Sequence, residues 1–489
     1  MLRGAVAAAL VALGVLVLFA GWSSKQQHAP RRGEQPLTLH PENSNYFLFR
    51  GKPTILVGSG VYGAVIHRDF DYIVYLNELS RLGLNQTRLF TGSYVARSSA
   101  GGEGYADSLV PRDRLLAPWA RSAVPGYALG GNKFDLDRWD PEYYSRLRSF
   151  VAEAGRRGVI VEIVFFSANY GESNWSASPM QADNNVNGIG RVAANETYRL
   201  DGEPGLLAAQ ERLVEKIVNE LNRFDNVYYE PLNEPQHAAC PDGVASCDPP
   251  GDWEERIIGV IDRTERSLGR RHLIAHGVGN VGFPIGKVPS AVSILNFHYA
   301  RPQAVRANYE LGLAIADDET GLQGTSDQPY RIEGWQFMLA GGAVFSNLDW
   351  TFTADREDGT RALPEDFHYG GGGVELRKQL AFMKRFLESF DLVHLRPARA
   401  LIRRRAPAGA TVQALGRRGR GYAIYVSGGS GVARLSLDLP AGRYRLTWQD
   451  PKTGRMTKRA KLAHAGGKET VVSPRYSDDL ALAIRSIRG

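Results

Sequence analysis

The chain has 489 residues, of which 43% are hydrophobic and 23% are charged, and its formal net charge is +7. This composition excludes a disordered or fibrous protein. The length predicts one large domain together with a smaller one.

The amino terminus begins Met-Leu-Arg and continues as an unbroken apolar run from Gly4 to Trp22. The run is nearly long enough to span a bilayer, and it is longer than the usual apolar core of a signal peptide. No small-x-small cleavage site and no lipid-anchor cysteine follow it. We therefore expect residues 1–22 to form an uncleaved membrane anchor, with a cleaved secretion signal as the alternative, and residues 23–40 to form a linker. Both interpretations imply export.

Eight short apolar segments, rich in Val, Ile and Leu without strict alternation, follow the linker. They cover residues 54–60, 85–90, 159–166, 227–234, 272–278, 292–299, 313–319 and 343–350. Such segments are typical of parallel strands that are covered on both faces. With a helix or a long loop after each strand, they predict a (β/α)8 TIM barrel over residues 41–396. A doubly wound open sheet is the alternative, but no glycine-rich phosphate loop follows the first strand.

From about residue 397 the pattern changes to short alternating strands separated by Gly, Pro and Asp turns. This pattern predicts a small all-β sandwich domain over residues 397–489. From Ala400 onward the chain carries 18 Lys and Arg against 5 Asp and Glu. A segment so basic either faces an anionic partner or is only a solvated face, which is the commoner case.

The active site of such a barrel lies at the carboxyl ends of its strands. Two carboxylates end predicted strands there, Glu234 on the fourth and Glu319 on the seventh. Hydrolysis of a glycosidic bond requires such a pair, one carboxyl to protonate the leaving oxygen and one to attack or stabilise the anomeric carbon. We expect apolar surroundings to keep Glu234 protonated.

Other residues near the strand ends suit a sugar-binding cleft. Arg88 on the second strand would keep Glu319 ionised, and Asn233 would donate a hydrogen bond to a substrate hydroxyl. His298 and Tyr299 offer further donors, although His298 could equally be a buried histidine with a structural partner. Trp350 would stack on the face of a sugar ring.

Four motifs together resemble the clan A glycoside hydrolases, especially the cellulase-like enzymes of family 5. They are EPLNEP (230–235), NFHYARP (296–302), DDETG (317–321) and LDWTFT (348–353). The resemblance covers roughly residues 40–395. It implies that Glu234 is the acid/base and Glu319 the nucleophile of a retaining hydrolase acting on a poly- or oligosaccharide.

This resemblance has two departures and one open alternative. The third strand lacks the histidine that many family 5 enzymes carry at its end, and a shift of one residue would make Asp318 the nucleophile. The carboxyl-terminal domain is similar to the small domain of apiosidase-like glycosidases. A non-catalytic carbohydrate-binding or adhesion protein on a degenerate barrel is the alternative function.

Two loops complete the set of expectations. Cys240 and Cys247 lie in a loop rich in Pro, Gly and Asp, where an exported chain would form a disulfide. Zinc is the weaker alternative because His237 is the one nearby additional ligand. Trp175, in a long loop after the third strand, is either a cleft wall or a loop anchor. We expect no metal, no organic cofactor and no nucleic-acid partner, and a monomer.

Overall fold

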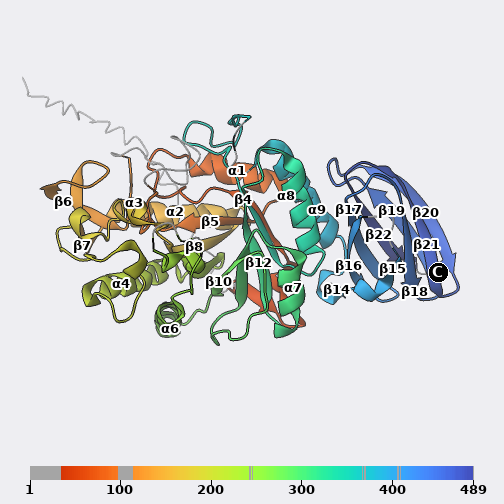
Figure 1. Cartoon of the computed structure of the whole chain (residues 1–489), viewed down its shortest axis with the longest axis horizontal. Coiled ribbons are helices and arrows are strands. Elements are labelled where there is room, and N and C mark those ends of the chain that lie inside the picture. Colours follow the sequence, from red (N-terminus) through yellow and green to blue (C-terminus); the bar gives the residue numbers. More distant parts are fainter. Residues whose placement is uncertain are drawn as a thin grey trace, which may run out of the picture.

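The structure is a computed structural model that describes residues 35–96, 114–241, 244, 246–365, 367, 371–404, 407 and 409–487. A large α/β domain lies beside a smaller domain made of strands (Figure 1). The predicted membrane anchor lies outside the described residues. Strand β1 (Thr38–His40) shows that the predicted linker ends earlier than residue 40. Within the described ranges, no helix is both long and apolar enough to cross a membrane.

All eight predicted barrel strands are present in the structure. They are β4 (Leu56–Gly60), β5 (Gln86–Phe90), β8 (Ile160–Ser167), β9 (Val227–Asn233), β10 (Ala275–Asn280), β11 (Ile294–His298), β12 (Ala314–Thr320) and β13 (Val344–Leu348). They pair in parallel in the order β10-β11-β12-β13-β4-β5-β8-β9. A parallel bridge between Tyr229 and Ile274 joins the two ends of this series, so the sheet closes into a barrel.

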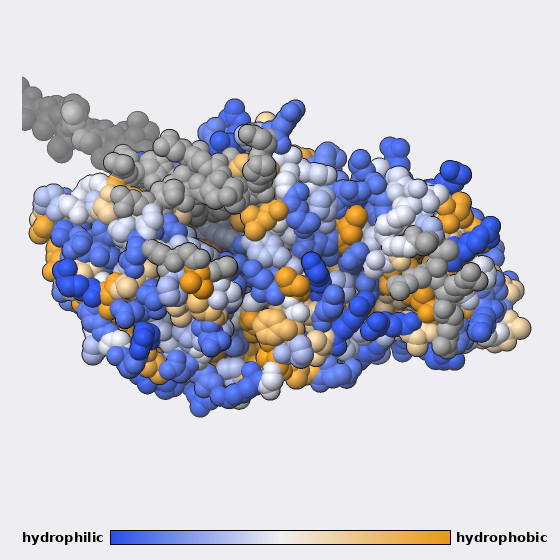
Figure 2. All heavy atoms as spheres, in the orientation of Figure 1, coloured by the Kyte–Doolittle hydropathy of each residue, from blue (hydrophilic) through white to orange (hydrophobic). Residues whose placement is uncertain are grey.

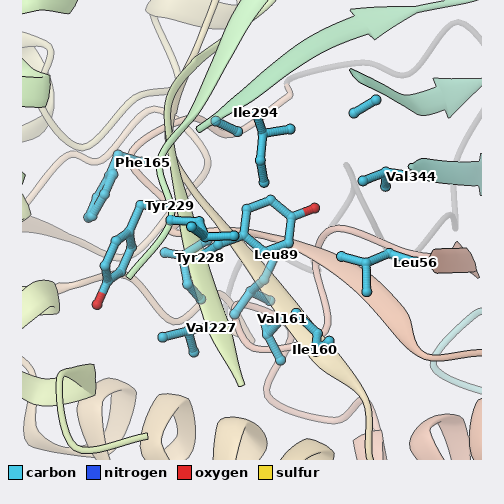
Figure 3. Close-up of a cluster of buried hydrophobic side chains, with 14 of the residues drawn as sticks. Leu56, Leu89, Ile160, Val161, Phe165, Val227, Tyr228, Tyr229, Ile294 and Val344 are labelled. Carbon is cyan, nitrogen blue, oxygen red and sulfur yellow. The ribbon is translucent and has the colours of Figure 1, made fainter. Parts of the chain in front are cut away.

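The barrel strands are buried on both faces, as their unalternating sequences predict. Leu56, Val161 and Val344 are fully buried, and Figure 3 shows side chains of several barrel strands meeting in one cluster. The predicted fifth strand starts later, at Ala275, and the predicted eighth strand ends earlier, at Leu348.

Seven helices of seven residues or more surround the barrel in the described part of the chain. They are α1 (Tyr72–Leu82), α2 (Pro141–Arg156), α4 (Pro204–Leu221), α6 (Gly251–Leu268), α7 (Pro302–Asn308), α8 (Asp327–Met338) and α9 (Val374–Glu388). A loop rather than a helix joins β10 to β11. The apolar stripe of α4 is buried at Leu206, Leu213, Ile217 and Leu221, so the sequence pattern correctly identifies its inner face.

Local sequence signals set the ends of these helices. The Asp71 carboxylate accepts hydrogen bonds from the backbone N–H groups of Ile73 and Val74 at the start of α1, and Gly83 ends this helix in the left-handed conformation. Asp140 caps α2 in the same way, with Pro141 in the first turn.

Several elements lie outside the repeating strand and helix units. The amino-terminal sheet comprises β1, β2 (Asn43–Phe49) and β3 (Lys52–Thr54), and a hairpin of β6 (Trp119–Pro125) and β7 (Asn132–Trp139) separates β5 from α2. Short helical turns are α3 (Glu172–Trp175), α5 (Pro235–Ala238), η1 (Ala182–Asn184), η2 (Ala194–Glu196), η3 (Tyr309–Leu311), η4 (Leu392–His394) and η5 (Arg399–Leu401). The β6–β7 hairpin has no counterpart in the predicted elements.

The carboxyl-terminal domain is a sandwich of two antiparallel sheets, as predicted. One sheet has β14 (Arg396–Pro397), β16 (Thr411–Arg417), β17 (Gly421–Ser427), β22 (Asp479–Ser486), β19 (Gly442–Gln449) and β20 (Met456–His464), and the other has β15 (Ile402–Arg404), β18 (Gly431–Leu439) and β21 (Gly467–Tyr476). The predicted boundary near Pro397 falls within the first of these strands.

Buried contacts join the sandwich to the barrel. Trp335 of α8 stacks on Tyr425 of β17 with 5.1 Å between the ring centroids. Arg331 of the same helix forms an ion pair with Asp479 at 2.9 Å, and both side chains are buried. The two domains therefore share an interface with apolar and charged contacts.

Candidate active site

Two glutamates meet at the carboxyl ends of the barrel strands. Glu234 directly follows β9, and Glu319 lies near the end of β12. One carboxylate oxygen of each and a ring nitrogen of His298 all lie within 4.8 Å of one another. Glu234 is 9% exposed and Glu319 is 7% exposed, so the pair sits in a largely enclosed part of the barrel mouth.

Three side chains hold the Glu319 carboxylate from two sides. The hydroxyl of Tyr62 donates to Oε2 at 2.9 Å, and Nη1 of Arg88 donates to the same oxygen at 3.0 Å. The hydroxyl of Tyr299 donates to Oε1 at 2.8 Å. These donors fix the orientation of the carboxylate.

Glu234 lies between a tyrosine and a histidine. The hydroxyl of Tyr170 donates to Oε2 at 2.6 Å, and Nδ1 of His298 is 3.1 Å from Oε1. Burial alone would raise the pKa of Glu234, but the hydrogen bond and charge of His298 and the hydrogen bond from Tyr170 lower that pKa to about 2. The prediction that apolar surroundings keep Glu234 protonated is therefore wrong, because polar groups contact both of its carboxylate oxygens.

His298 connects Glu234 to the buried carboxylate of Asp318. Its Nε2 is 3.2 Å from Oδ1 of Asp318, on the opposite side of the ring from Glu234. Burial alone would lower the pKa of His298, but the charge of Glu319 and the contacts with Asp318 and Glu234 raise it well above 6.5. His298 thus holds a proton between the carboxylates of Glu234 and Asp318, and it shares that proton with Glu234.

Arg88 is surrounded by buried acidic groups beneath the mouth. Its guanidinium is 2.5 Å from Glu230, 2.7 Å from Asp318 and 3.4 Å from Glu162, in addition to its contact with Glu319. One cation cannot neutralise four carboxylates, and burial, the first cause in each case, raises the pKa of both Glu162 and Glu230. Arg88 contacts Glu319 as expected, but it is 1% exposed and lies below the barrel mouth.

Asp318 and Glu319 point to different places. Asp318 is fully buried and faces Arg88 and His298, whose charges lower its pKa against the effect of burial. Glu319 retains some exposure at the mouth. Of the two acidic residues left open by the sequence, Glu319 is the one placed to meet a substrate.

The structure also shows the surroundings of the remaining predicted residues, Asn233, Trp350 and Trp175. Asn233 is buried and donates to the hydroxyl of Tyr170 at 2.9 Å, while its Oδ1 accepts from Arg88. Trp350 follows β13 at the mouth and packs edge-on against Phe367. Trp175 is 1% exposed and its indole N–H donates to the carbonyl of Val192 at 2.8 Å, which makes it a loop anchor rather than a cleft wall.

Tyr62 and Tyr170 contact the two glutamates, but neither residue is among the site residues predicted from the sequence. Tyr62 comes two residues after the end of β4, and Tyr170 comes three residues after the end of β8. Their signal in the sequence is a position within a few residues after a predicted strand. Only the fold could show which carboxylate each hydroxyl meets.

Two groups in the described part of the chain bring enough ligand atoms together for a metal ion. They are Glu234 with His298 and Glu319, and Glu162 with Glu230 and Asp318. The guanidinium of Arg88 already contacts three of these carboxylates at 3.0 Å or less. A further cation in the second group would lie beside that charge, which makes the site a poor fit for one.

The loop after Glu234 contains the predicted disulfide. Cys240 and Cys247 are bonded, with 5.4 Å between their Cα atoms. The backbone N–H of Cys247 donates to the carbonyl of Gln236 at 2.8 Å, two residues after Glu234. The disulfide therefore ties down the loop beside the site.

No protein-family model matches the sequence, and the comparison with curated proteins gives no match. Three solved structures are similar over both domains. A protein from Bacteroides vulgatus ATCC 8482 that is proposed to be a glycoside hydrolase has 14% identity and a TM-score of 0.63, covering 94% of this chain and 84% of its own. A second glycoside hydrolase has 12% identity and a TM-score of 0.59, with 92% and 97% coverage.

The third is a family 5 glycoside hydrolase from the same Bacteroides vulgatus strain. It has 13% identity and a TM-score of 0.58, and the match covers 93% of this chain and 94% of that one. Identities this low establish the architecture alone. The chain therefore has the fold of these glycoside hydrolases, a (β/α)8 barrel followed by a β-sandwich, as its resemblance to family 5 enzymes predicts.

Proposed function

We propose that the protein is an exported retaining glycoside hydrolase that cleaves O-glycosidic bonds of a poly- or oligosaccharide. The observation that carries this proposal is the separation of at most 4.8 Å between one oxygen of Glu234 and one of Glu319. Retaining enzymes place their two carboxyl groups about 5–5.5 Å apart, whereas inverting enzymes need about 6.5–9.5 Å to admit a water. The fold supports the same conclusion.

Glu319 is the nucleophile in this proposal. Its carboxylate attacks the anomeric carbon as the bond from that carbon to the leaving oxygen breaks, giving a covalent glycosyl-enzyme. Tyr62 and Tyr299 orient the carboxylate through the hydrogen bonds already described. Arg88 is a positioning residue that acts through Glu319.

Glu234 supplies the proton to the leaving oxygen. The contact of 3.1 Å between Nδ1 of His298 and Oε1 of Glu234 provides the route by which the shared proton reaches the carboxyl group. Glu234 then accepts a proton from the water that releases the sugar. Asp318 stabilises the charged form of His298, so the pair of His298 and Glu234 keeps a proton at neutral pH.

The test is hydrolysis of a panel of plant and bacterial glycans by the fragment from residue 33. Glu319→Gln should abolish turnover, and Glu234→Gln should lower kcat about 10²–10⁴-fold, with a smaller loss on substrates whose leaving group needs no protonation. Glu310→Gln, a change at an exposed glutamate of η3, is the matched control. Binding of glycans without turnover across the panel would instead support a carbohydrate-binding protein.

Export and membrane attachment are part of the proposal. The disulfide supports export, because such bonds persist in oxidising compartments. Fractionation of cells that express the full chain should place it with the membrane, and deletion of residues 4–22 should release it. A cleaved signal would give a soluble exported protein with a shortened amino terminus.

A further inference from the structure

A large cleft extends from Tyr299, near the barrel mouth, to the sandwich domain. Its volume is about 960 Å³, which is at the upper end of the usual range for ligand pockets. Tyr299 lines this cleft and also donates to Glu319, so the cleft starts one side chain away from the proposed nucleophile. Thr411 and Gln413 of β16 form part of its other side.

The walls of this cleft come from both domains, which are held together on either side of it. Nη2 of Arg306 on α7 donates to Oε1 of Gln413 at 2.8 Å, and Nε2 of Gln336 on α8 donates to Oγ of Ser427 at 2.8 Å. The buried pair of Arg331 and Asp479 lies in the same interface. The wall contributed by the sandwich is therefore fixed in place.

The cleft carries more positive than negative charge. Arg301, Arg306 and Arg399 line it, against one described acidic residue, Glu333. Oε2 of Glu333 accepts from the hydroxyl of Thr320 at 2.5 Å and from Gln323 at 2.8 Å, which satisfies that oxygen within the protein. Figure 2 shows hydrophilic residues over the junction between α7 and the sandwich.

Strained backbone also gathers along this cleft. Val281, Tyr299 and Leu322 line it with φ values of 69°, 49° and 62°. The left-handed conformation is costly for any residue with a side chain, and most of all for a β-branched one such as Val281. Leu322 is also 55% exposed. Strain of this kind concentrates at functional sites, where the surrounding structure enforces it.

We propose that this cleft binds an anionic sugar unit of the substrate, one that carries a carboxylate or a sulfate, through Arg301, Arg306 and Arg399. This inference rests on the proposed hydrolase activity and specifies its substrate class. Arginine suits the task because its planar fork pairs with carboxylate and sulfate oxygens. The glutamine amides along the cleft suit sugar hydroxyls.

The experiment compares oligosaccharides that differ only in one group, a hydroxymethyl, a carboxylate or a sulfate ester. Binding is measured by calorimetry with Glu319→Gln, and kcat/KM is measured with the unaltered protein. We expect either anionic form to bind at least tenfold more tightly than the neutral one, and to lose that advantage as the salt concentration rises. The two anionic arms distinguish the carboxylate from the sulfate.

Arg301→Gln and Arg399→Gln should each reduce the ratio of anionic to neutral kcat/KM about tenfold or more, because each removes a charge-assisted hydrogen bond. Arg443→Gln is the matched control, since it removes one exposed charge from β19 of the sandwich domain, and Arg443 does not line the cleft. Equal affinity for all three oligosaccharides, or an equal loss in Arg443→Gln, would overturn the inference while leaving the hydrolase proposal intact. If Glu319→Gln bound the anionic oligosaccharides but the unaltered protein did not hydrolyse them, the hydrolase proposal would be overturned and the binding of anionic sugars by the cleft would stand.

Discussion

His298 joins the proposed acid/base to a carboxylate that never meets the substrate. Its two ring nitrogens contact Glu234 at 3.1 Å and Asp318 at 3.2 Å. The raised pKa of the imidazole and the lowered pKa of Glu234 are two consequences of one shared proton. Interacting sites of this kind titrate as a pair.

His298→Gln should move the alkaline limb of the pH profile of kcat/KM to lower pH. In the unaltered protein the pair keeps its proton until the pH passes the raised pKa of His298. Without the imidazole, the proton is held by Glu234 alone and is lost at lower pH. Rates measured from pH 4 to 10 with a substrate that needs leaving-group protonation would show the shift, and an unchanged limb would contradict the shared proton.

Arg88→Met should lower the free energy of unfolding by about 3–5 kcal/mol at neutral pH, because it leaves buried carboxylates without their cation. The difference from the unaltered protein should shrink as the pH falls, since protonation removes the repulsion among Glu162, Glu230 and Asp318. Urea unfolding at pH 7 and pH 4 measures both effects. A loss that does not depend on pH would point to packing alone.

Removal of divalent metals should leave activity unchanged. The carboxylate oxygens of Glu319 already accept from Tyr62, Tyr299 and Arg88, and Arg88 provides the positive charge below them. Activity after dialysis against EDTA, with and without added Ca²⁺ or Zn²⁺, gives the measurement. Loss on chelation with recovery on addition would show that a metal binds at one of the two carboxylate groups.

At the scale of elements, the carboxyl ends of β9 and β12 and the loops that follow them carry the proposed chemistry. Glu234, at the start of the turn after β9, has φ of 50°, and Tyr299, just after β11, has φ of 49°. These left-handed residues turn the chain where it leaves the two strands. The closely packed barrel below stabilises these strained backbone conformations.

The disulfide should stabilise the loop after β9 more than the whole domain. Replacing Cys240 and Cys247 by Ser should cost about 2 kcal/mol, as expected for a bond that closes a short loop. Because the loop begins beside Glu234, we expect KM to rise more than kcat falls. Thermal unfolding of the variant with and without reductant provides the control, since reductant should lower the Tm of the unaltered protein alone.

At the scale of the whole molecule, the sandwich is an integral part of the structure rather than a tethered appendage. Trp335 and Tyr425 stack across the interface, and the hydroxyl of Tyr425 donates to Asp479 at 2.7 Å. Arg331 meets the same carboxylate from the barrel side. The two domains should therefore unfold together.

Arg331→Ala should destabilise the protein by about 3–5 kcal/mol, because the buried carboxylate of Asp479 then loses its cation and keeps only the hydrogen bond from Tyr425. Arg331→Ala with Asp479→Ala should cost less than the sum of the two single changes, which a double-mutant cycle in urea would measure. Arg443→Gln again serves as the exposed control. Two separate unfolding transitions in the unaltered protein would contradict the joint unfolding.

The sequence alone determined the barrel, the sandwich and the proposed glutamate pair. Each rests on local information. A few neighbouring positions are enough to recognise the strands rich in Val, Ile and Leu, the turn spacing and the residues at strand ends. The same information misplaced the end of the linker, omitted the β6–β7 hairpin, and left Trp175 and Asp318 undecided. These features depend on how each segment or side chain is oriented in the folded protein.

Only the tertiary structure decided the environment of the site. Tyr62, Arg88, Glu319 and His298 come from four strands or their ends across more than two hundred residues, and no spacing in the chain predicts which oxygen meets which donor. The lowered pKa of Glu234 and the basic cleft beside the sandwich also arise from residues that only the tertiary structure brings together. Charges interact through space, so their energies depend on the closed barrel and the docked second domain rather than on neighbours in the chain.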